Sequence, residues 1–470
     1  MTADLVLKGG IVVTEGGPVR ADVEIRGESI VGLRAPDKAP TASRVMDVSG
    51  LHVLPGLVDT HSHHREPGFT HKEDITTATA ACAAGGVTVS VAMPNVYPPP
   101  TTPQILREMF SLYEAKALVD YNINAAGTNL EAIPELAKMG ILSFKVFMVV
   151  DTGRDYPHMP GIGVHDHGKL LAIFKAVAGT GLPIMVHPHD QQLMDEIEQE
   201  YWRRGERDFR AYAKAYSAMD GMIWDTAVGV LLNLQKATGV HLHVLHMQTI
   251  ESVEMLKAAR AQGRPVTAEV NPWALWLGND WANIERLGSY ALSYYVPPKH
   301  SQAIWHGLLE NVIDMIATDH APHAKEEKEP GWTDGWKAHT GTPSAQHYLS
   351  LLLTDVNAGK LSLKKAVELV SENPAKVFNL YPRKGAIRIG ADADLVVVDM
   401  AAKATITDDT VLSRCGWTPY HGREVQGIPV HTILRGNVVF QDGKVVGRPG
   451  QGKLARRVSD PQAGARPVFS

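Results

Sequence analysis

The feature that most constrains the fold of this sequence is a regular alternation of two kinds of segment through its middle. Short runs rich in β-branched residues, each suited to one buried strand, are separated by longer stretches with helical periodicity. The short runs are Val87–Met93, Phe144–Val150, Pro183–Val186, Leu242–Leu245, Pro265–Val270 and Val312–Ala317. The longer stretches are Glu73–Ala84, Lys169–Ala178, Thr226–Thr238 and Ile250–Gln262. This alternation predicts an α/β fold with a parallel sheet, and a (β/α)8 TIM barrel is its closed form.

The two ends of the chain have a different texture. Both consist of short strand-like runs interrupted by glycine pairs and turn residues such as Gly9-Gly10 and Gly436-Asn437. Two β-rich flanks around a different middle predict one small β-sandwich domain built from both chain ends, although two separate small domains would look similar. The expected parts are sandwich residues 1–54, barrel residues 55–384, sandwich residues 385–448 and a basic tail, 449–470, that is extended or forms a subunit contact.

Composition excludes several classes of protein. The chain has 470 residues and a net charge of −5 without a basic stripe, which argues against nucleic-acid binding and favours a small substrate. No run reaches the roughly 18 apolar residues that a membrane span needs, and the first residues lack a signal-peptide pattern. Cys82 and Cys415 are the only cysteines, so no disulfide framework is expected and the cytoplasm is the expected location.

Histidines at the ends of the expected strands indicate the chemistry. His61 and His63 follow an apolar run, and alternation along a strand points both side chains the same way, so they can bind one metal ion. His187, His246 and Asp319 each end a further run. A single histidine in such a place is most often structural. Because barrel enzymes carry their catalytic residues at the ends of the strands, the set as a whole favours a metal centre.

Lys145 lies within an apolar run, where a lysine is unusual. A buried lysine commonly pairs with a carboxylate, but burial also lowers the pKa of its amine and so favours the neutral form. A neutral amine can take up CO₂ and become a carbamate, N6-carboxylysine, whose two oxygens can bridge two divalent ions. A water between such ions is a hydroxide near neutral pH and a ready nucleophile.

The motifs that contain these residues resemble those of the cyclic amidohydrolases of the amidohydrolase superfamily. His61–Gly68 (HSHHREPG) and Ala317–His323 (ATDHAPH) are similar to the dihydroorotase signature and catalytic motif. Ser143–Met148 (SFKVFM) resembles the carboxylated-lysine segment of hydantoinases, dihydropyrimidinases and allantoinases. The resemblance runs from about Leu5 to Lys444, with the motifs in the expected order.

This resemblance implies a (β/α)8 barrel with a β-sandwich and a binuclear centre, usually of Zn²⁺. His61, His63 and Asp319 would bind the more buried ion, His187 and His246 would bind the second, and carbamylated Lys145 would bridge the two. A bridging hydroxide would attack the ring amide carbon, and Asp319 would pass its proton to the leaving nitrogen. Relatives of this kind are often dimers or tetramers, so a homodimer or homotetramer is expected.

The substrate is less strongly indicated. Arg65, Asn95 and His323 match positions that hold the substrate carboxylate in dihydroorotases, which favours an anionic ring. Three segments depart from the dihydroorotase pattern: Val296–His300, His339–Ser344 and Asn271–Trp276. In the last, Trp273 and Trp276 would either line the pocket or pack in the core. Dihydroorotate therefore stands beside allantoin, hydantoins, dihydropyrimidines and cyclic imides as a possible substrate.

Two other classes of protein share the fold. Dihydropyrimidinase-like scaffold proteins lose metal ligands, whereas all six expected ligand positions are filled in this chain. Deaminases of the same superfamily usually bind one metal ion and need no bridging lysine. Both classes therefore fit the sequence less well than a hydrolase of cyclic amides.

Overall fold

The structure is a computed structural model that describes residues 2–36, 42–149, 161–291 and 294–459. Val150, the last residue of one predicted strand, and residues 460–470 of the predicted tail lie outside the described residues. Within the part that is described, no helix is both long and apolar enough to cross a membrane.

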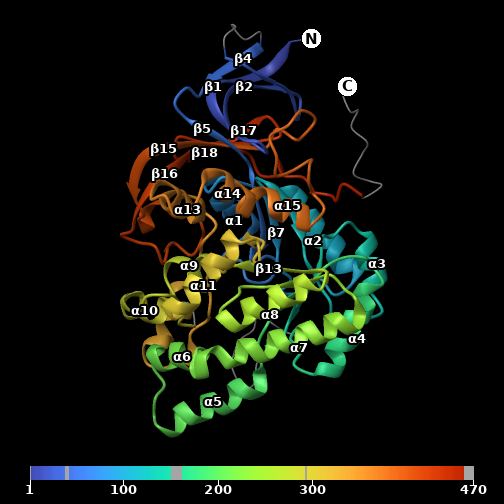
Figure 1. Cartoon of the computed structure of the whole chain (residues 1–470), viewed down its shortest axis with the longest axis vertical. Coiled ribbons are helices and arrows are strands. Elements are labelled where there is room, and N and C mark those ends of the chain that lie inside the picture. The colour runs from blue at the N-terminus through green and yellow to red at the C-terminus, as the bar shows by residue number, and fades with distance from the viewer. Residues whose placement is uncertain (1, 37–41, 150–160, 292–293, 460–470) are drawn as a thin grey trace.

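Strands from both ends of the chain form one sheet of nine strands, in the order β18-β17-β16-β15-β5-β1-β2-β3, with β4 paired to β1. Strand β5 joins the two halves, because it pairs with β1 on one side and with β15 on the other. Figure 1 shows the N-terminal strands, in blue, beside the C-terminal strands, in orange and red, at the top of the molecule. The strands are β1 (Ala3–Thr14), β2 (Gly17–Arg26), β3 (Ser29–Arg34), β4 (Ala42–Asp47), β5 (His52–Pro55), β15 (Leu395–Thr405), β16 (Glu424–Leu434), β17 (Asn437–Gln441) and β18 (Lys444–Val445).

The glycine pair Gly9-Gly10 does not interrupt a strand as the sequence suggests. It lies inside β1, where the pairing with β2 shifts register between Leu7 and Gly10. Gly9 has a φ of 75°, a conformation that glycine adopts without strain. The pair therefore forms a bulge in one long strand and not a turn between two short ones.

The middle of the chain forms parallel strands in two sheets, so the fold is mixed α/β as predicted. One sheet has the order β6-β7-β8 and the other the order β14-β13-β12-β11-β10-β9. The strands are β6 (Leu57–Ser62), β7 (Val87–Ala92), β8 (Asp120–Ile123), β9 (Ala125–Ala126), β10 (Phe144–Phe147), β11 (Ile184–His187), β12 (Leu242–Val244), β13 (Val266–Val270) and β14 (Met315–Ile316). Every pairing within these two sheets is parallel.

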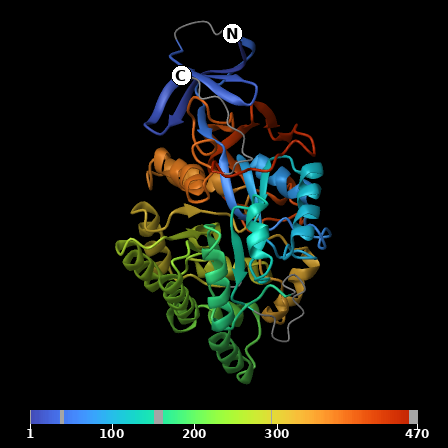
Figure 2. The ribbon, with the colours of Figure 1, turned by 90° about the vertical axis from the view of Figure 1, so that its right-hand side faces the viewer.

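Helices lie between these strands in the sequence, and α5, α6 and α7 lie in the lower part of Figure 1; Figure 2 shows the molecule from its right-hand side. The helices are α1 (Ile75–Ala84), α2 (Pro103–Lys116), α3 (Ile133–Lys138), α4 (His167–Ala178), α5 (Gln191–Arg203), α6 (Phe209–Tyr216), α7 (Met222–Thr238), α8 (Ile250–Ala261), α9 (Pro272–Trp276), α10 (Trp281–Leu287), α11 (Pro298–Leu309), α12 (Lys325–Lys328), α13 (Tyr348–Asn357), α14 (Leu363–Val367) and α15 (Asn373–Val377). Helix α1 begins later than predicted, because the Asp74 carboxylate caps it by accepting the Thr77 N–H.

Strand β14 is much shorter than the predicted run Val312–Ala317. The side chain of Asp314 provides a reason, since its Oδ2 accepts the N–H of Ala268 at 2.8 Å. In a regular sheet the Ala268 N–H would donate to a backbone carbonyl of the neighbouring strand. Here it donates to this side chain instead. The run still lies beside β13, with Ala317 N–H donating to the Val270 carbonyl at 3.1 Å.

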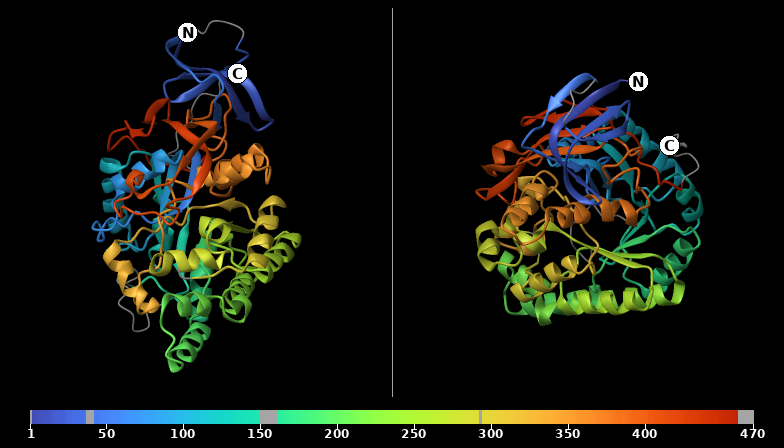
Figure 3. Two further views of the ribbon diagram at one scale, coloured as in Figure 1. Left: turned by 90° about the vertical axis from the view of Figure 1, so that its left-hand side faces the viewer. Right: turned by 45° about the horizontal axis from the view of Figure 1, so that its top comes forward.

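The described part of the predicted tail, residues 449–459, packs against its own chain, and a subunit contact of the tail stays a prediction. The Tyr121 N–H donates to the Lys453 carbonyl at 3.0 Å, and the Ala455 N–H donates to the Tyr121 carbonyl at 2.8 Å. Ala455 is buried. This segment therefore runs beside β8 and covers its edge; Figure 3 shows the chain from two further sides.

Candidate metal centre

Strand β6 and the segment after β14 bring His61, His63 and Asp319 to one point. The Nε2 atoms of His61 and His63 lie 3.1 Å and 3.2 Å from Oδ1 of Asp319. The three ligand atoms all lie within 4.8 Å of one another. Two imidazole nitrogens and one carboxylate oxygen converging in this way are a suitable donor set for a divalent ion.

The other ring nitrogen of each of these two histidines is engaged. Nδ1 of His61 lies 2.5 Å from a carboxylate oxygen of Glu269, and Nδ1 of His63 lies 2.5 Å from the amide oxygen of Asn95. Because these oxygens only accept, each Nδ1 must donate, which leaves the Nε2 lone pairs directed at Asp319. Two nitrogen lone pairs that face a carboxylate oxygen repel it unless a cation lies between them. A metal ion or a proton can be that cation.

His64, the buried histidine that follows this pair in the sequence, differs in this respect. His64 contacts the Tyr113 hydroxyl at 2.9 Å with Nδ1 and the Ser90 hydroxyl at 3.0 Å with Nε2. Both of its nitrogens are therefore occupied by protein groups. His61 and His63 keep one nitrogen directed at the common point, which distinguishes a candidate ligand from a structural histidine.

A second pair of imidazoles lies next to the first. His187 ends β11, and its ring centroid is 4.5 Å from that of His246, which follows β12. The ring of His246 is in turn 5.9 Å from that of His61. Nδ1 of His246 is buried and has no hydrogen-bond partner among the residues that the structure describes. The structure thus brings four of the predicted histidine ligands together.

Lys145 lies on β10 and is almost completely buried. Its Nζ has no hydrogen-bond partner within the described part of the chain and lies 4.2 Å from the centroid of the Phe147 ring. Burial lowers the pKa of this amine to about 7, although the charges of Asp319 and Glu269 oppose the shift. A buried, unpartnered ammonium is costly, so the site fits a neutral or carbamylated lysine.

Burial also keeps most of these imidazoles uncharged, which is the form that binds metal. It lowers the pKa of His63 to about 3 and that of His246 to about 4. His61 is different: burial lowers its pKa, but the carboxylates of Asp319 and Glu269 outweigh burial and raise it to about 9. In the metal-free protein, a proton on His61 therefore provides the positive charge between His61, His63 and Asp319.

Three of the predicted site residues have backbone conformations that side chains rarely adopt. The φ angles of Arg65, His246 and Asp319 are 60°, 33° and 45°. Such conformations cost on the order of 1–3 kcal/mol each and are concentrated at functional sites. The strained residues thus coincide with the predicted site, each near the end of a strand.

Of the three residues expected to hold a carboxylate, two contact each other and the third contacts His63. Arg65 and His323 lie together, with Nη2 of Arg65 3.1 Å from Nε2 of His323, and Nε of Arg65 donates to the Pro322 carbonyl at 3.2 Å. Asn95 instead contacts His63. Arg65 is nonetheless close to the centre, since its charge contributes to lowering the pKa of His63.

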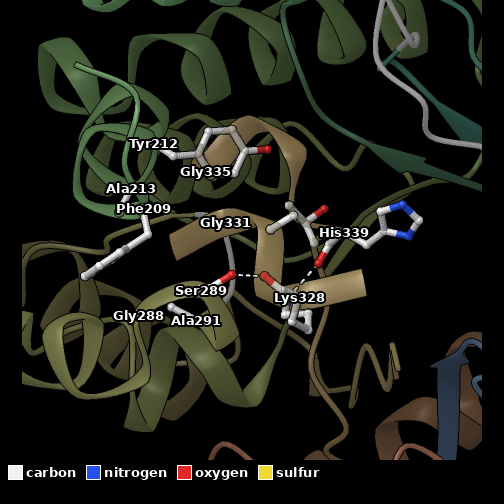
Figure 4. A pocket seen from close by; sticks show the side chains of 12 residues that line it. Phe209, Tyr212, Ala213, Gly288, Ser289, Ala291, Lys328, Gly331, Gly335 and His339 are labelled. Atoms are coloured by element: carbon white, nitrogen blue, oxygen red, sulfur yellow. Dashed lines mark hydrogen bonds between the residues drawn. The ribbon is translucent and has the colours of Figure 1, made fainter. Parts of the chain in front are cut away.

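A second group, His323, Glu327 and His339, could hold a metal ion by the spacing of its ligand atoms. However, the ammonium of Lys72 lies 2.6 Å from Oε1 of Glu327 and 3.3 Å from Nδ1 of His323. The place of a cation is therefore already filled by a lysine. Figure 4 shows the neighbouring pocket, where Lys328 donates to the His339 carbonyl at 2.7 Å.

Several residues that the sequence does not single out contribute to the site. Glu269 contacts His61, and the amide of Asn271 donates to Oδ2 of Asp319 at 3.2 Å and to the Tyr294 hydroxyl at 2.8 Å. Glu269 could have been found, because a carboxylate in the apolar run of β13 is as unusual as Lys145 in β10. Asn271 carries no such signal.

The two tryptophans of the segment after β13 pack in the core. Trp273 donates to the Tyr294 carbonyl at 2.8 Å, and Trp276 donates to the Asp355 carboxylate at 2.7 Å. Both are buried. Of the two roles left open for them, the structure supports packing.

Known proteins resemble this chain over almost its whole length. Residues 52–439 match the Amidohydrolase family. An L-hydantoinase of Paenarthrobacter aurescens is 31% identical over 97% of this chain and 98% of its own length, and a dihydroorotase of Methanosarcina mazei is 32% identical over 92% and 93%. A solved structure of the L-hydantoinase (dihydropyrimidinase) from Arthrobacter aurescens has a TM-score of 0.91 at 30% identity and covers 97% of this chain and 100% of that one.

The chain therefore belongs to the amidohydrolase family. Within that family it is an enzyme of the cyclic amidohydrolase group, a hydrolase of carbon–nitrogen bonds. This class agrees with the resemblance of its motifs.

Proposed function

We propose that this enzyme opens the ring of a cyclic amide at a pair of divalent metal ions, with Zn²⁺ as the expected metal. One ion would be held by His61, His63 and Asp319, the other by His187 and His246, and Lys145 would bridge them as N6-carboxylysine. The observation that carries the proposal is the buried amine of Lys145, which has no hydrogen-bond partner among the described residues. Its charge contributes to lowering the pKa of both His187 and His246, and the charge of Asp319 in turn acts to raise the pKa of the amine.

When bound, the two ions would polarise the amide carbonyl and lower the pKa of a water molecule. The chain itself supplies the proton acceptor. Burial raises the pKa of Asp319, but His61 and its neighbours outweigh burial and hold it well below its usual range, so Asp319 is ionised. Asn271 fixes its Oδ2 while Oδ1 faces His61 and His63. Asp319 can therefore accept the proton of the attacking water and deliver it to the leaving nitrogen.

The substrate that we favour is a ring carrying a carboxylate, as in dihydroorotate. Arg65 lies beside the centre, and Lys72 and Lys328 lie near it, since the charge of Arg65 lowers the pKa of both. Lys72 is already paired with Glu327, so Arg65 is the cation on this side that favours an anion.

A neutral hydantoin-type ring is the second candidate. Arg65 and His323 already contact each other and backbone carbonyls, which leaves fewer of their donors for a substrate. The resemblance to an L-hydantoinase over 97% of this chain also supports this candidate.

The test is a turnover panel with zinc-loaded protein. It should contain dihydroorotate, carbamoyl-aspartate, allantoin, dihydrouracil, hydantoins and cyclic imides, with metal-stripped protein as the control. We expect hydrolysis of at least one cyclic amide that depends on two bound ions per chain. Arg65→Met should then raise KM for an anionic ring by about 10- to 100-fold, which corresponds to one hydrogen bond to a charged group, and leave a neutral ring unaffected. A protein that binds two ions but hydrolyses no ring would contradict the proposal.

We also propose that the two parallel sheets close into a (β/α)8 barrel and that residues 1–54 and 385–448 form a single β-sandwich domain. A bridge between Ser62 and His320 supports closure, because it joins the end of β6 to the segment after β14. The pairing of β5 with both β1 and β15 supports a single domain. A cytoplasmic location and a dimer or tetramer remain predictions from the sequence.

A further inference from the structure

Glu269 is a completely buried carboxylate on β13, and the mechanism above does not use it. One of its oxygens accepts from Nδ1 of His61 at 2.5 Å, and the other accepts from Nε2 of His243 at 3.2 Å. Both oxygens are therefore bound to imidazoles, one of a candidate ligand and one of a histidine that faces away from the centre.

The second imidazole is itself held in place. Nδ1 of His243 lies 2.9 Å from the Thr267 hydroxyl, and that hydroxyl also lies 2.9 Å from Nε2 of His241. Because Glu269 only accepts, His243 donates with Nε2, and in a neutral ring its Nδ1 then accepts the Thr267 proton. The Thr267 oxygen then accepts from His241. With a neutral ring at His243, the hydrogen bonds from His241, Thr267 and His243 all donate in the direction of Glu269.

We propose that Glu269 is the positioning residue of the metal centre: it fixes the tautomer and ring orientation of His61, and His243 and Thr267 hold it in place. This inference rests on the proposed metal-binding role of His61. A carboxylate that accepts the second N–H of a metal-bound histidine also makes the ligating nitrogen more basic, and losing such a partner typically lowers metal affinity by about 10- to 100-fold.

Glu269→Gln tests the proposal, because the amide keeps the shape and removes the charge. Zinc affinity is measured by competition with a chelator, and the visible spectrum of the cobalt-loaded protein reports the ligand geometry independently of activity. We expect an affinity about 10- to 100-fold lower for one of the two ions, an altered cobalt spectrum, and a lower kcat with KM nearly unchanged. Thr267→Val, which removes the support behind His243, should give a smaller loss in the same direction.

Glu73→Gln is the matched control. Glu73 is also completely buried and faces a histidine, His320, at 3.4 Å, but that histidine is not a candidate ligand. The metal affinity and cobalt spectrum of Glu73→Gln should equal those of the unmodified enzyme. Thermal unfolding of the metal-free proteins distinguishes a folding defect from a weaker metal centre. If Glu269→Gln and Thr267→Val match Glu73→Gln in affinity and spectrum, the inference is wrong. If the unmodified enzyme itself binds no pair of ions, the proposed function fails instead.

Discussion

Lys145 is the residue whose surroundings are hardest to explain without a modification. Its amine is buried beside the Phe147 ring and close to His187, His246 and Asp319. We expect Lys145→Ala to retain at most one metal ion per chain and to lower kcat by on the order of 10³-fold, equivalent to about 4 kcal/mol of barrier. Metal analysis by mass spectrometry and steady-state kinetics measure both effects.

The control for this variant is a second buried lysine, Lys328, whose amine donates to two backbone carbonyls at 2.7 Å and 3.3 Å. Lys328→Met removes a buried lysine without removing the bridge, so two ions should remain. Millimolar acetate or propionate should restore part of the activity of Lys145→Ala by supplying the missing carboxylate. Two ions and full activity in Lys145→Ala would disprove the assignment of the bridge.

The pKa of Lys145 also makes a prediction about pH. Burial lowers it to about 7, so the neutral amine that reacts with CO₂ predominates above pH 7 and is lost as the pH falls below that value. We expect the carbamate signal of the metal-free protein in ¹³C-bicarbonate to rise with pH around a midpoint near 7. Carbon NMR measures this signal directly. A midpoint near that of an exposed lysine, about 10.4, would contradict the inferred desolvation.

Among the elements, the seam between β6 and the segment after β14 determines where Asp319 lies. The two oxygens of Asp59 accept from the Thr318 backbone N–H at 2.9 Å and from its hydroxyl at 2.6 Å. Thr318→Val keeps the shape of the side chain and removes the second hydrogen bond, leaving a buried carboxylate oxygen without it. We expect a loss of about 1–3 kcal/mol in the free energy of unfolding, measured by urea denaturation.

Thr238→Val is the control for this seam. The Thr238 hydroxyl also donates a hydrogen bond, at 2.8 Å to the Leu234 carbonyl, but it lies in the partly exposed last turn of α7. Water can replace that bond, so the loss should stay within about 0.5 kcal/mol. Equal losses in the two variants would show that the Asp59 contact does not stabilise the seam.

The elements also show what the sequence can and cannot predict. His187 and Asp319 were predictable because a polar residue at the end of an apolar run stands out along the chain, and a family resemblance then suggests its role. Asn271 was not, since its contact with Asp319 depends on how two segments pair across a sheet. Gly9-Gly10 was misread for the same reason: only the partner strand shows that the pair forms a bulge.

At the scale of the whole molecule, a buried lysine connects the nine-stranded sheet to the parallel strands. Nζ of Lys384 lies 2.5 Å from carboxylate oxygens of Asp120, at the start of β8, and of Asp394, just before β15. Lys384→Met would remove this cation from both buried carboxylates, and Arg435 would remain as the partner of Asp120. We expect a loss of about 3–5 kcal/mol in the free energy of unfolding, measured by urea denaturation with activity recorded in parallel.

Lys376→Met is the comparison for this variant, because Lys376 pairs with Glu372 four residues away on an exposed surface. A surface pair of this kind contributes at most about 0.5 kcal/mol. If the two lysine variants unfold at the same urea concentration, the buried cluster does not hold the two parts of the molecule together.

The pairing of β5 with β15 also has a consequence during synthesis on the ribosome. β5 ends at Pro55 and its partner strand begins at Leu395, so about 340 residues separate them in the nascent chain. At about 5–20 residues per second, one edge of β5 waits roughly 17–70 s for its partner to emerge. An unpaired strand edge can join another chain, so newly made copies on one messenger are most prone to aggregate in this interval, when chaperones would be most needed.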